Sequence, residues 1–203
     1  GSENLGRASA VIVAHDNVHR RLSMGQLLGG TQVIPAPAAA LPVVTFGEDL
    51  TFHLNGDDIR VLHVDHAHTD GDALVYWTRA NVIHMGDTFF NGMLPFVDLE
   101  SGGSIDGLLA ALGQAIEMTN ETTRVIPGHG PMATRAELSA YRDVLTGLRA
   151  QIFDAIEQGR SLDEIKAMRL ADRYGRDTDF ITPDAFVEAV HGSLTAAPEA
   201  HHH

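Results

Sequence analysis

The chain has 203 residues, with 14 Lys and Arg against 27 Asp and Glu, so its formal net charge at neutral pH is −13. This length suits one domain, or one domain with a helical appendage, and an apolar fraction of 44% is ordinary for a globular protein. An acidic chain is a poor nucleic-acid binder, because neutralising phosphates requires clustered Lys and Arg. The count of zero cysteines excludes a disulfide framework, a thiol nucleophile and a Cys-ligated metal site. Any metal must therefore be bound by His and carboxylate.

Membrane and export signals are not apparent. No apolar run approaches the roughly 20 residues that cross a bilayer, and the chain opens without the basic and apolar regions of a signal peptide. We therefore expect no membrane partner, and the compartment stays open between cytoplasm and periplasm. Residues 201–203 are three histidines that resemble a purification tag, which leaves nine of the twelve histidines to explain.

The first half of the chain is predicted to consist mainly of strands and turns. Asp16 is a plausible N-cap for a helix through Leu22, and residues 29–42, rich in Gly and Pro, have the composition of a loop. The dipeptide Asn55-Gly56 lies between two alternating segments and is a strong hairpin signal. The strands predicted in this half are residues 10–14, 50–54, 59–64, 73–77 and 82–85.

The second half is predicted to be mainly helical, apart from a short strand at residues 124–126. Helices begin where Ser or Thr can cap them, in two places with a Glu three residues later, and in one place with Pro at the first helical position. These signals are Ser104, Thr134 with Glu137, Ser161 with Glu164, and Thr182-Pro183. The first helix should end near Met118 and the second near Gln158. The whole pattern predicts a layered α/β domain.

Three short stretches place metal-competent side chains directly after predicted strands. Residues 63–72 (HVDHAHTDGD) contain three His and three Asp, residues 84–87 read HMGD, and residues 127–130 read PGHG. Imidazole and carboxylate donors suit zinc, manganese or iron. The glycines on both sides of His129 allow a tight turn that aims its ring inward. The alternative is that each polar residue is only a turn residue or a helix cap.

The strings HAHTDGD, IHMGDTFF and IPGHGP, in this order and spacing, resemble the downstream motifs of the metallo-β-lactamase-fold hydrolases over about residues 1–135. The resemblance implies a four-layer αββα sandwich with a dinuclear zinc site at one edge between the sheets; manganese or iron would also suit. The implied metal ligands are His68, Asp87 and His129. Asp87 would bridge the two ions and is therefore also the implied catalytic residue.

The resemblance also implies a division of the chain. Residues 1–133 would form the C-terminal part of the sandwich, residues 134–196 a helical extension packed on it, and residues 197–203 a tail with the tag remnant. The family's upstream His-x-His-x-Asp-His motif is not in the sequence, and residues 3–6 (ENLG) resemble the segment that follows it. We therefore expect an N-terminally incomplete copy, without roughly the first sheet and four of seven ligands.

The implied activity is metal-dependent hydrolysis of a small ester, lactam or thioester by a metal-bound hydroxide. One alternative is a non-catalytic fragment or half-domain, which forms a homodimer or complements an N-terminal segment. A second is a mononuclear metal module built from His63, Asp65, His66 and His68. Alternation along a regular strand opposes this second alternative, because it would direct the four side chains to both faces.

Other side chains near these motifs have lesser predicted roles. Asp70 and Asp72 are candidates to orient the ligating imidazoles, although each also suits a turn. His84 is expected to make local contacts, and His15 with His19 to lie on a solvated helix face. The apolar residues after Asp87 could form the wall of a substrate pocket; they are Phe89, Phe90, Met93, Leu94 and Phe96.

Overall fold

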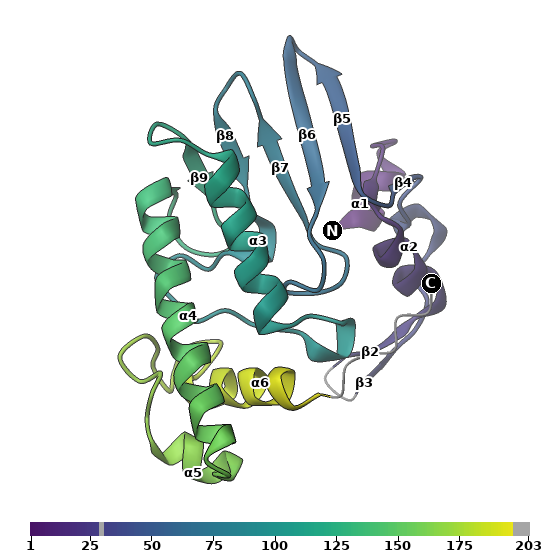
Figure 1. Ribbon diagram of the computed structural model, residues 1–203. Helices are drawn as coiled ribbons and strands as arrows, with labels where there is room; N and C mark the ends of the chain where they lie inside the picture. The colour runs from purple at the N-terminus through teal and green to yellow at the C-terminus, as the bar shows by residue number, and fades with distance from the viewer. Residues whose placement is uncertain (29–30, 197–203) are drawn as a thin grey trace.

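The computed structural model describes residues 1–28 and 31–196. Gly29-Gly30 of the predicted loop and the predicted tail at 197–203 lie outside these residues. A six-stranded sheet in the order β10-β9-β8-β7-β6-β5 forms the centre of the molecule (Figure 1). Across the described ranges, no helix combines the length and apolar character that crossing a bilayer requires.

The strands of the large sheet agree closely with the predicted segments, except for β10, which lies outside them. They are β5 (Asp49–Leu54), β6 (Asp57–His63), β7 (Ala73–Trp77), β8 (Val82–His84), β9 (Arg124–Ile126) and β10 (Ala133–Thr134). The predicted hairpin joins β5 to β6, and Asn55 and Gly56 have positive φ angles of 54° and 75°, which match the twist of the flanking strands. β8 and β9 are parallel, whereas every other neighbouring pair is antiparallel.

Helices cover one face of this sheet. Figure 1 shows α3 and α4 side by side over it, with α6 crossing near their lower ends. The helices are α3 (Ile105–Met118), α4 (Arg135–Glu157), α5 (Leu162–Ala167) and α6 (Pro183–Thr195). All four predicted caps are confirmed, and both predicted capping boxes have their reciprocal hydrogen bonds. α4 ends near Gln158 as predicted, and Gly159, with a φ of 74°, follows it.

The two faces of the sheet are buried to different extents. On the helix face, Leu74, Ile83 and Val125 have no exposed surface and belong to the main core with α3, α4 and α6. The opposite face, which we call the open face, carries Phe52, Ile59, Val75, Trp77 and Val82. All five are only partly buried, whereas Val61 on the same face is 8% exposed, and none of the six belongs to the core cluster identified among the described residues.

The N-terminal region lies beside the β5 edge (Figure 1) and differs from its prediction in detail. The strand expected at 10–14 is β1 at Val13–His15, because these residues pair in parallel with β4. The N-cap is His15 rather than Asp16, since its Nδ1 accepts the Asn17 N–H. The predicted loop at 29–42 contains a strand, β3, which pairs with β2. The elements are α1 (Ser2–Arg7), β1 (Val13–His15), α2 (Asp16–Met24), β2 (Gln26–Leu28), β3 (Thr31–Val33) and β4 (Val44–Phe46).

Candidate metal centre

The three metal-competent stretches meet at one edge of the large sheet. β8 and β9 are parallel, and β6 has the same direction as β8 because β7 is antiparallel to both. The C-terminal ends of β6, β8 and β9 therefore lie at the same edge. Loops from these ends carry His68, Asp87 and His129, respectively.

Asp87 and His129 face each other at this edge. The His129 Nε2 lies 3.4 Å from the Asp87 Oδ1, and the two side chains are 51% and 41% exposed. His129 stacks on the ring of Phe90, with 4.7 Å between centroids and 19° between planes. The backbone of Phe90 also forms a parallel bridge with that of His129. Phe90 thus fixes the orientation of the His129 ring, and the His129 Nε2 stays accessible beside the Asp87 carboxylate.

Glycine is required where β9 leaves the sheet. A Cβ at position 128 would overlap the Asp87 Oδ1 and the Gly86 carbonyl oxygen. Gly130, with a φ of 95°, passes equally close to the carbonyl of Asn91. The predicted tight turn around His129 is therefore present, and Gly128 in particular leaves the space that the Asp87 carboxylate occupies.

His68 is oriented by a carboxylate of its own loop. Its Nδ1 lies 3.6 Å from the Asp72 Oδ1, and 16% of the side chain is exposed. Burial lowers the pKa of His68, but the contact with Asp72 and the negative charges of Asp72, Asp87 and Asp98 outweigh it and raise the pKa above its usual value. Asp87 thus acts on His68 electrostatically. Asp98, which the sequence interpretation missed, is 6% exposed and also donates its N–H to the His68 carbonyl at 2.9 Å.

The three predicted ligands have the donor atoms that a metal needs, but too few of them are gathered at one point. Asp87 with His129 offers a carboxylate and an imidazole, donors that suit zinc, manganese or iron. With Nδ1 facing Asp72, His68 keeps Nε2 for a ligand. In residues 1–28 and 31–196, however, no group of three or more His, Asp or Glu side chains is gathered closely enough to hold an ion.

The mononuclear module considered above is wrong. His63 Nε2 lies 3.2 Å from Asp65, which is 87% exposed, whereas His66 Nδ1 faces the Gly102 carbonyl and His68 faces Asp72. β6 ends at His63, and the chain then turns, with His66 at a positive φ of 49°. His63 and Asp65 therefore face each other, whereas His66 and His68 point to other partners, and the four side chains do not converge.

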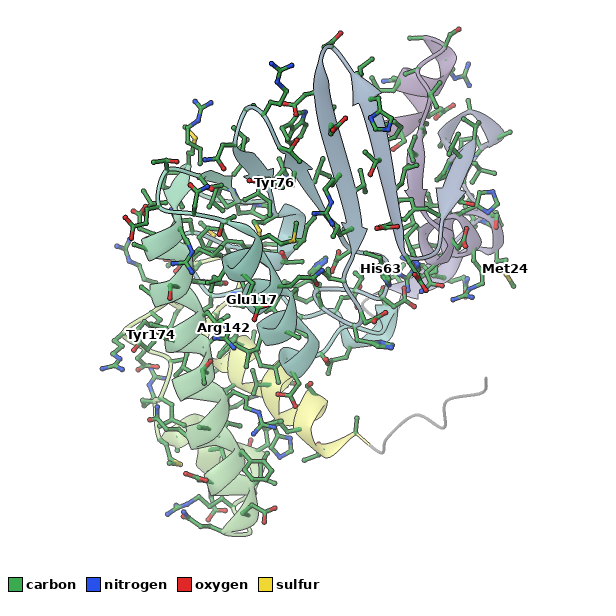
Figure 2. All side chains as sticks on the ribbon, turned by 45° about the horizontal axis from the view of Figure 1, so that its top comes forward. Met24, His63, Tyr76, Glu117, Arg142 and Tyr174 are labelled. Carbon is green, nitrogen blue, oxygen red and sulfur yellow. The ribbon has the colours of Figure 1, made fainter. Side chains whose placement is uncertain are left out.

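A stacked histidine pair joins the N-terminal region to the sheet. The rings of His15 and His63 lie 3.7 Å apart and nearly parallel, and Figure 2 shows His63 at the end of β6. His15 is 7% exposed, so the prediction that it lies on a solvated face is wrong. Its Nε2 is 2.9 Å from the Gly47 carbonyl oxygen. The β1–β4 pairing that buries His15 joins segments distant in sequence, which local spacing did not reveal.

The remaining polar candidates divide between the site and its surroundings. Asp72 contacts His68, in agreement with its predicted orienting role, and also accepts the Thr69 N–H at 2.7 Å. Asp70 instead forms an ion pair with Arg21 of α2. His84 accepts the Gly86 N–H at 3.0 Å, the local contact expected of it.

Comparison with protein-family models decides the family. The model described as "Metallo-beta-lactamase superfamily" matches residues 5–147. The chain belongs to this superfamily. The mixed α/β architecture and the resemblance of the three motifs are thereby confirmed. No curated protein sequence matches the chain.

Solved structures share the fold at low sequence identity. The metallo-beta-lactamase from Pontibacter korlensis has a TM-score of 0.58 and 18% identity, covering 72% of this chain and 62% of its own length. The BLEG-1 B3 metallo-beta-lactamase gives 0.56 and 22%, covering 71% of this chain and 69% of its own. The inverting sec-alkylsulfatase Pisa1 from Pseudomonas sp. gives 0.59 and 15%, covering 94% of this chain and 37% of its own. The chain thus spans less than two thirds of the length of the Pontibacter protein.

Proposed function

We propose that the chain contributes one side of the metal centre of a hydrolase whose substrate is a small ester, lactam or thioester. The observation that carries the proposal is the pair of Asp87 and His129, 3.4 Å apart at the ends of two parallel strands and open to solvent. Membership of a superfamily that includes hydrolases supports it.

Each proposed ligand has a support that fixes its direction. Asp87 would supply the carboxylate ligand, in the space that Gly128 leaves. His129 is oriented by Phe90, and His68 is oriented by Asp72 so that its Nε2 is the ligating atom. The chemistry that two divalent ions, zinc or else manganese or iron, supply in such a site is a hydroxide at neutral pH and polarisation of the scissile bond.

Zinc titration followed by NMR of the histidine rings tests this proposal. These signals distinguish each imidazole from the three terminal histidines. We expect zinc to shift the His129 and His68 signals first, and Asp87→Asn to weaken that response. Asp58→Asn is the matched control, because Asp58 also faces an imidazole, that of the exposed His53, at 2.6 Å. A His129 signal that ignores zinc, or an equal effect of both variants, would refute the metal centre.

A second titration tests the orienting role of Asp72. Loss of a carboxylate behind a ligating imidazole typically weakens metal binding by about 10–100-fold. Asp72→Asn should therefore reduce the response of His68 to zinc, and the circular dichroism spectrum should show that the fold is kept. An unchanged response would mean that His68 ligates without Asp72 or not at all.

The open face supports a second candidate function. We propose, as the alternative, a non-catalytic half-domain that binds a second sheet, either from another copy of this chain or from an N-terminal segment that complements it. Apolar sheet faces are normally covered in folded proteins, yet Val75 and Trp77 here are only partly buried.

Trp77 provides the test, because it is the one tryptophan of the chain. Its emission should shift to the blue, and its quenching by acrylamide should fall, as a partner covers the open face. Sedimentation over a range of concentrations separates self-association from binding of an added segment. A monomeric chain whose Trp77 stays quenchable at every concentration would exclude the homodimer.

A further inference from the structure

A cavity of about 690 Å³ adjoins the candidate metal centre. It lies between the segment after Asp87 and the loop that joins α5 to α6, and His129 forms part of its wall. Figure 2 shows Tyr174 of this loop beside α4. The volume is in the range of small-molecule sites, about 300–1,000 Å³. The helical C-terminal region therefore forms a wall directly beside the residues proposed to carry the chemistry.

The walls of this cavity are largely apolar. Phe90, Met93 and Leu94 lie on one side, with Tyr174, Phe180 and Ile181 on the other. The two sides meet at Gly175, where a Cβ would lie 2.7 Å from the Leu94 Cδ1. Phe180 is 84% exposed and Met93 37% exposed. Large apolar side chains so accessible beside a cavity are typical of a surface that a ligand covers.

The charged groups at the cavity favour an anion. Two carboxylates line it, and both are engaged: Asp172 accepts from the Arg169 side chain at 2.6 Å, and Asp179 accepts the Arg176 backbone N–H at 2.8 Å. Arg173 and Arg176 are also among its lining residues. Arg173 lies over the Tyr174 ring at 4.5 Å.

Neither guanidinium has a carboxylate within 4.0 Å in the part of the chain that the structure describes. A guanidinium is a planar donor that binds carboxylate and sulfate-like groups through two hydrogen bonds. Arg173 and Arg176 are therefore available to an anionic ligand, whereas Asp172 is paired with Arg169 and Asp179 accepts a backbone N–H.

We infer that this cavity binds an amphiphilic anion, a molecule with an apolar tail or ring and one negatively charged group, as the substrate of the hydrolase. The inference rests on the proposed function and names its substrate class. The apolar part lies between the two walls, and the charged group lies at Arg173 and Arg176. The bond to be cleaved then lies on the His129 side of the cavity.

Calorimetric binding of 1-octanesulfonate to the metal-free chain tests this inference, because the probe needs neither metal nor turnover. Each methylene group that moves from water to an apolar wall raises affinity by about fourfold. We expect 1-octanesulfonate to bind at least about tenfold more tightly than 1-butanesulfonate. Octyltrimethylammonium, with the same chain and the opposite charge, should bind more weakly than 1-octanesulfonate.

Two matched variants locate the binding. Phe180→Ser removes an exposed apolar wall without touching the core and should weaken 1-octanesulfonate binding by about tenfold. Phe153→Ser is the control, because Phe153 of α4 is 37% exposed and does not line the cavity. The double variant Arg173→Gln with Arg176→Gln should remove the preference for the anionic probe over the cationic one.

Three results would overturn the inference: absence of 1-octanesulfonate binding, equal losses in Phe180→Ser and Phe153→Ser, or equal affinity for the cationic probe. The zinc titration of His129 is independent of these. If the probe binds as expected but His129 ignores zinc, the hydrolase is refuted while the ligand class of the cavity stands. The reverse pattern refutes the ligand class alone.

Discussion

The two faces of the large sheet differ in how completely their side chains are buried. Successive residues of β8, Val82 and Ile83, point to opposite faces, and so do Leu74 and Val75 of β7. Ile83 and Leu74 have no exposed surface and pack in the core, whereas Val82 and Val75 are only partly buried. Stability is therefore expected to depend more on the helix face than on the open face.

The largest expected effect is on the free energy of unfolding, and it differs between Ile83 and its neighbour Val82 on β8. Ile83→Ala removes fully buried methyl groups from the helix face and should lower the free energy of unfolding by about 3 kcal/mol. Val82→Ala on the open face should lower it by about 1 kcal/mol or less. Urea titrations measure both. Equal losses would show that something covers the open face as completely as the helices cover the other.

A second prediction concerns the candidate metal centre, at the C-terminal ends of β8 and β9. Gly128→Ala places a Cβ against the Asp87 carboxylate and should cost about 1–3 kcal/mol, with a displaced Asp87. Gly147→Ala is the control, since nothing lies within 4 Å of a Cβ there and the position is inside α4. Alanine there should stabilise the fold by about 0.5–1 kcal/mol. Urea titration gives both values; similar losses for the two variants would contradict the close packing at Gly128.

A third prediction concerns the start of α4, which covers the helix face. Thr134 accepts the Glu137 N–H, and Glu137 accepts the Thr134 N–H. Thr134→Ala should lower the free energy of unfolding by about 1 kcal/mol. Thr146→Ala, inside the same helix and exposed, removes only a hydroxyl that bonds the Arg142 carbonyl and should have little effect. Thermal denaturation measures both variants. Equal losses of stability in the two would contradict a capping role for Thr134.

The smallest effect is the acid dependence of that cap. Hydrogen bonds from the Thr134 N–H and hydroxyl lower the pKa of Glu137 below its usual 4.5. The unfolded chain therefore binds a proton more readily, so the stability from this carboxylate is present above pH 4.5 and is lost as the pH falls through the lowered pKa.

Glu137→Gln should accordingly flatten part of the decline in stability below pH 4.5. Glu157→Gln, at the other end of α4, is the control for removal of one carboxylate. Urea midpoints at several pH values measure both. A decline of the same steepness in all three proteins would show that the Glu137 contact does not contribute.

Local signals predicted much of this fold. The capping boxes at Thr134 and Ser161 and the turn at Asn55-Gly56 need only residues that are near in sequence, and each is present. The strand ends that carry Asp87 and His129 follow from apolar runs that stop at glycine. These signals act within a few residues, so they survive any arrangement of the distant parts.

What the sequence did not reveal depends on distant contacts. His15 is buried because β1 pairs with β4 and because its ring meets His63, which follows 48 positions later. Asp70 pairs with Arg21 of α2 rather than with a site histidine. The loop from Asp172 to Ile181 has no periodic pattern, so its position beside His129 could be seen only in the folded chain.

The register of β8 and β9 has a consequence for how this chain tolerates change in length. His84 pairs with Ile126, and Asp87 and His129 each follow three positions after those partners. One inserted residue in either short turn would offset the carboxylate from the imidazole, whereas insertions at residues 91–98 or 119–123 would leave their spacing intact. Homologous sequences should therefore vary in length at the latter segments and keep a constant interval in the former.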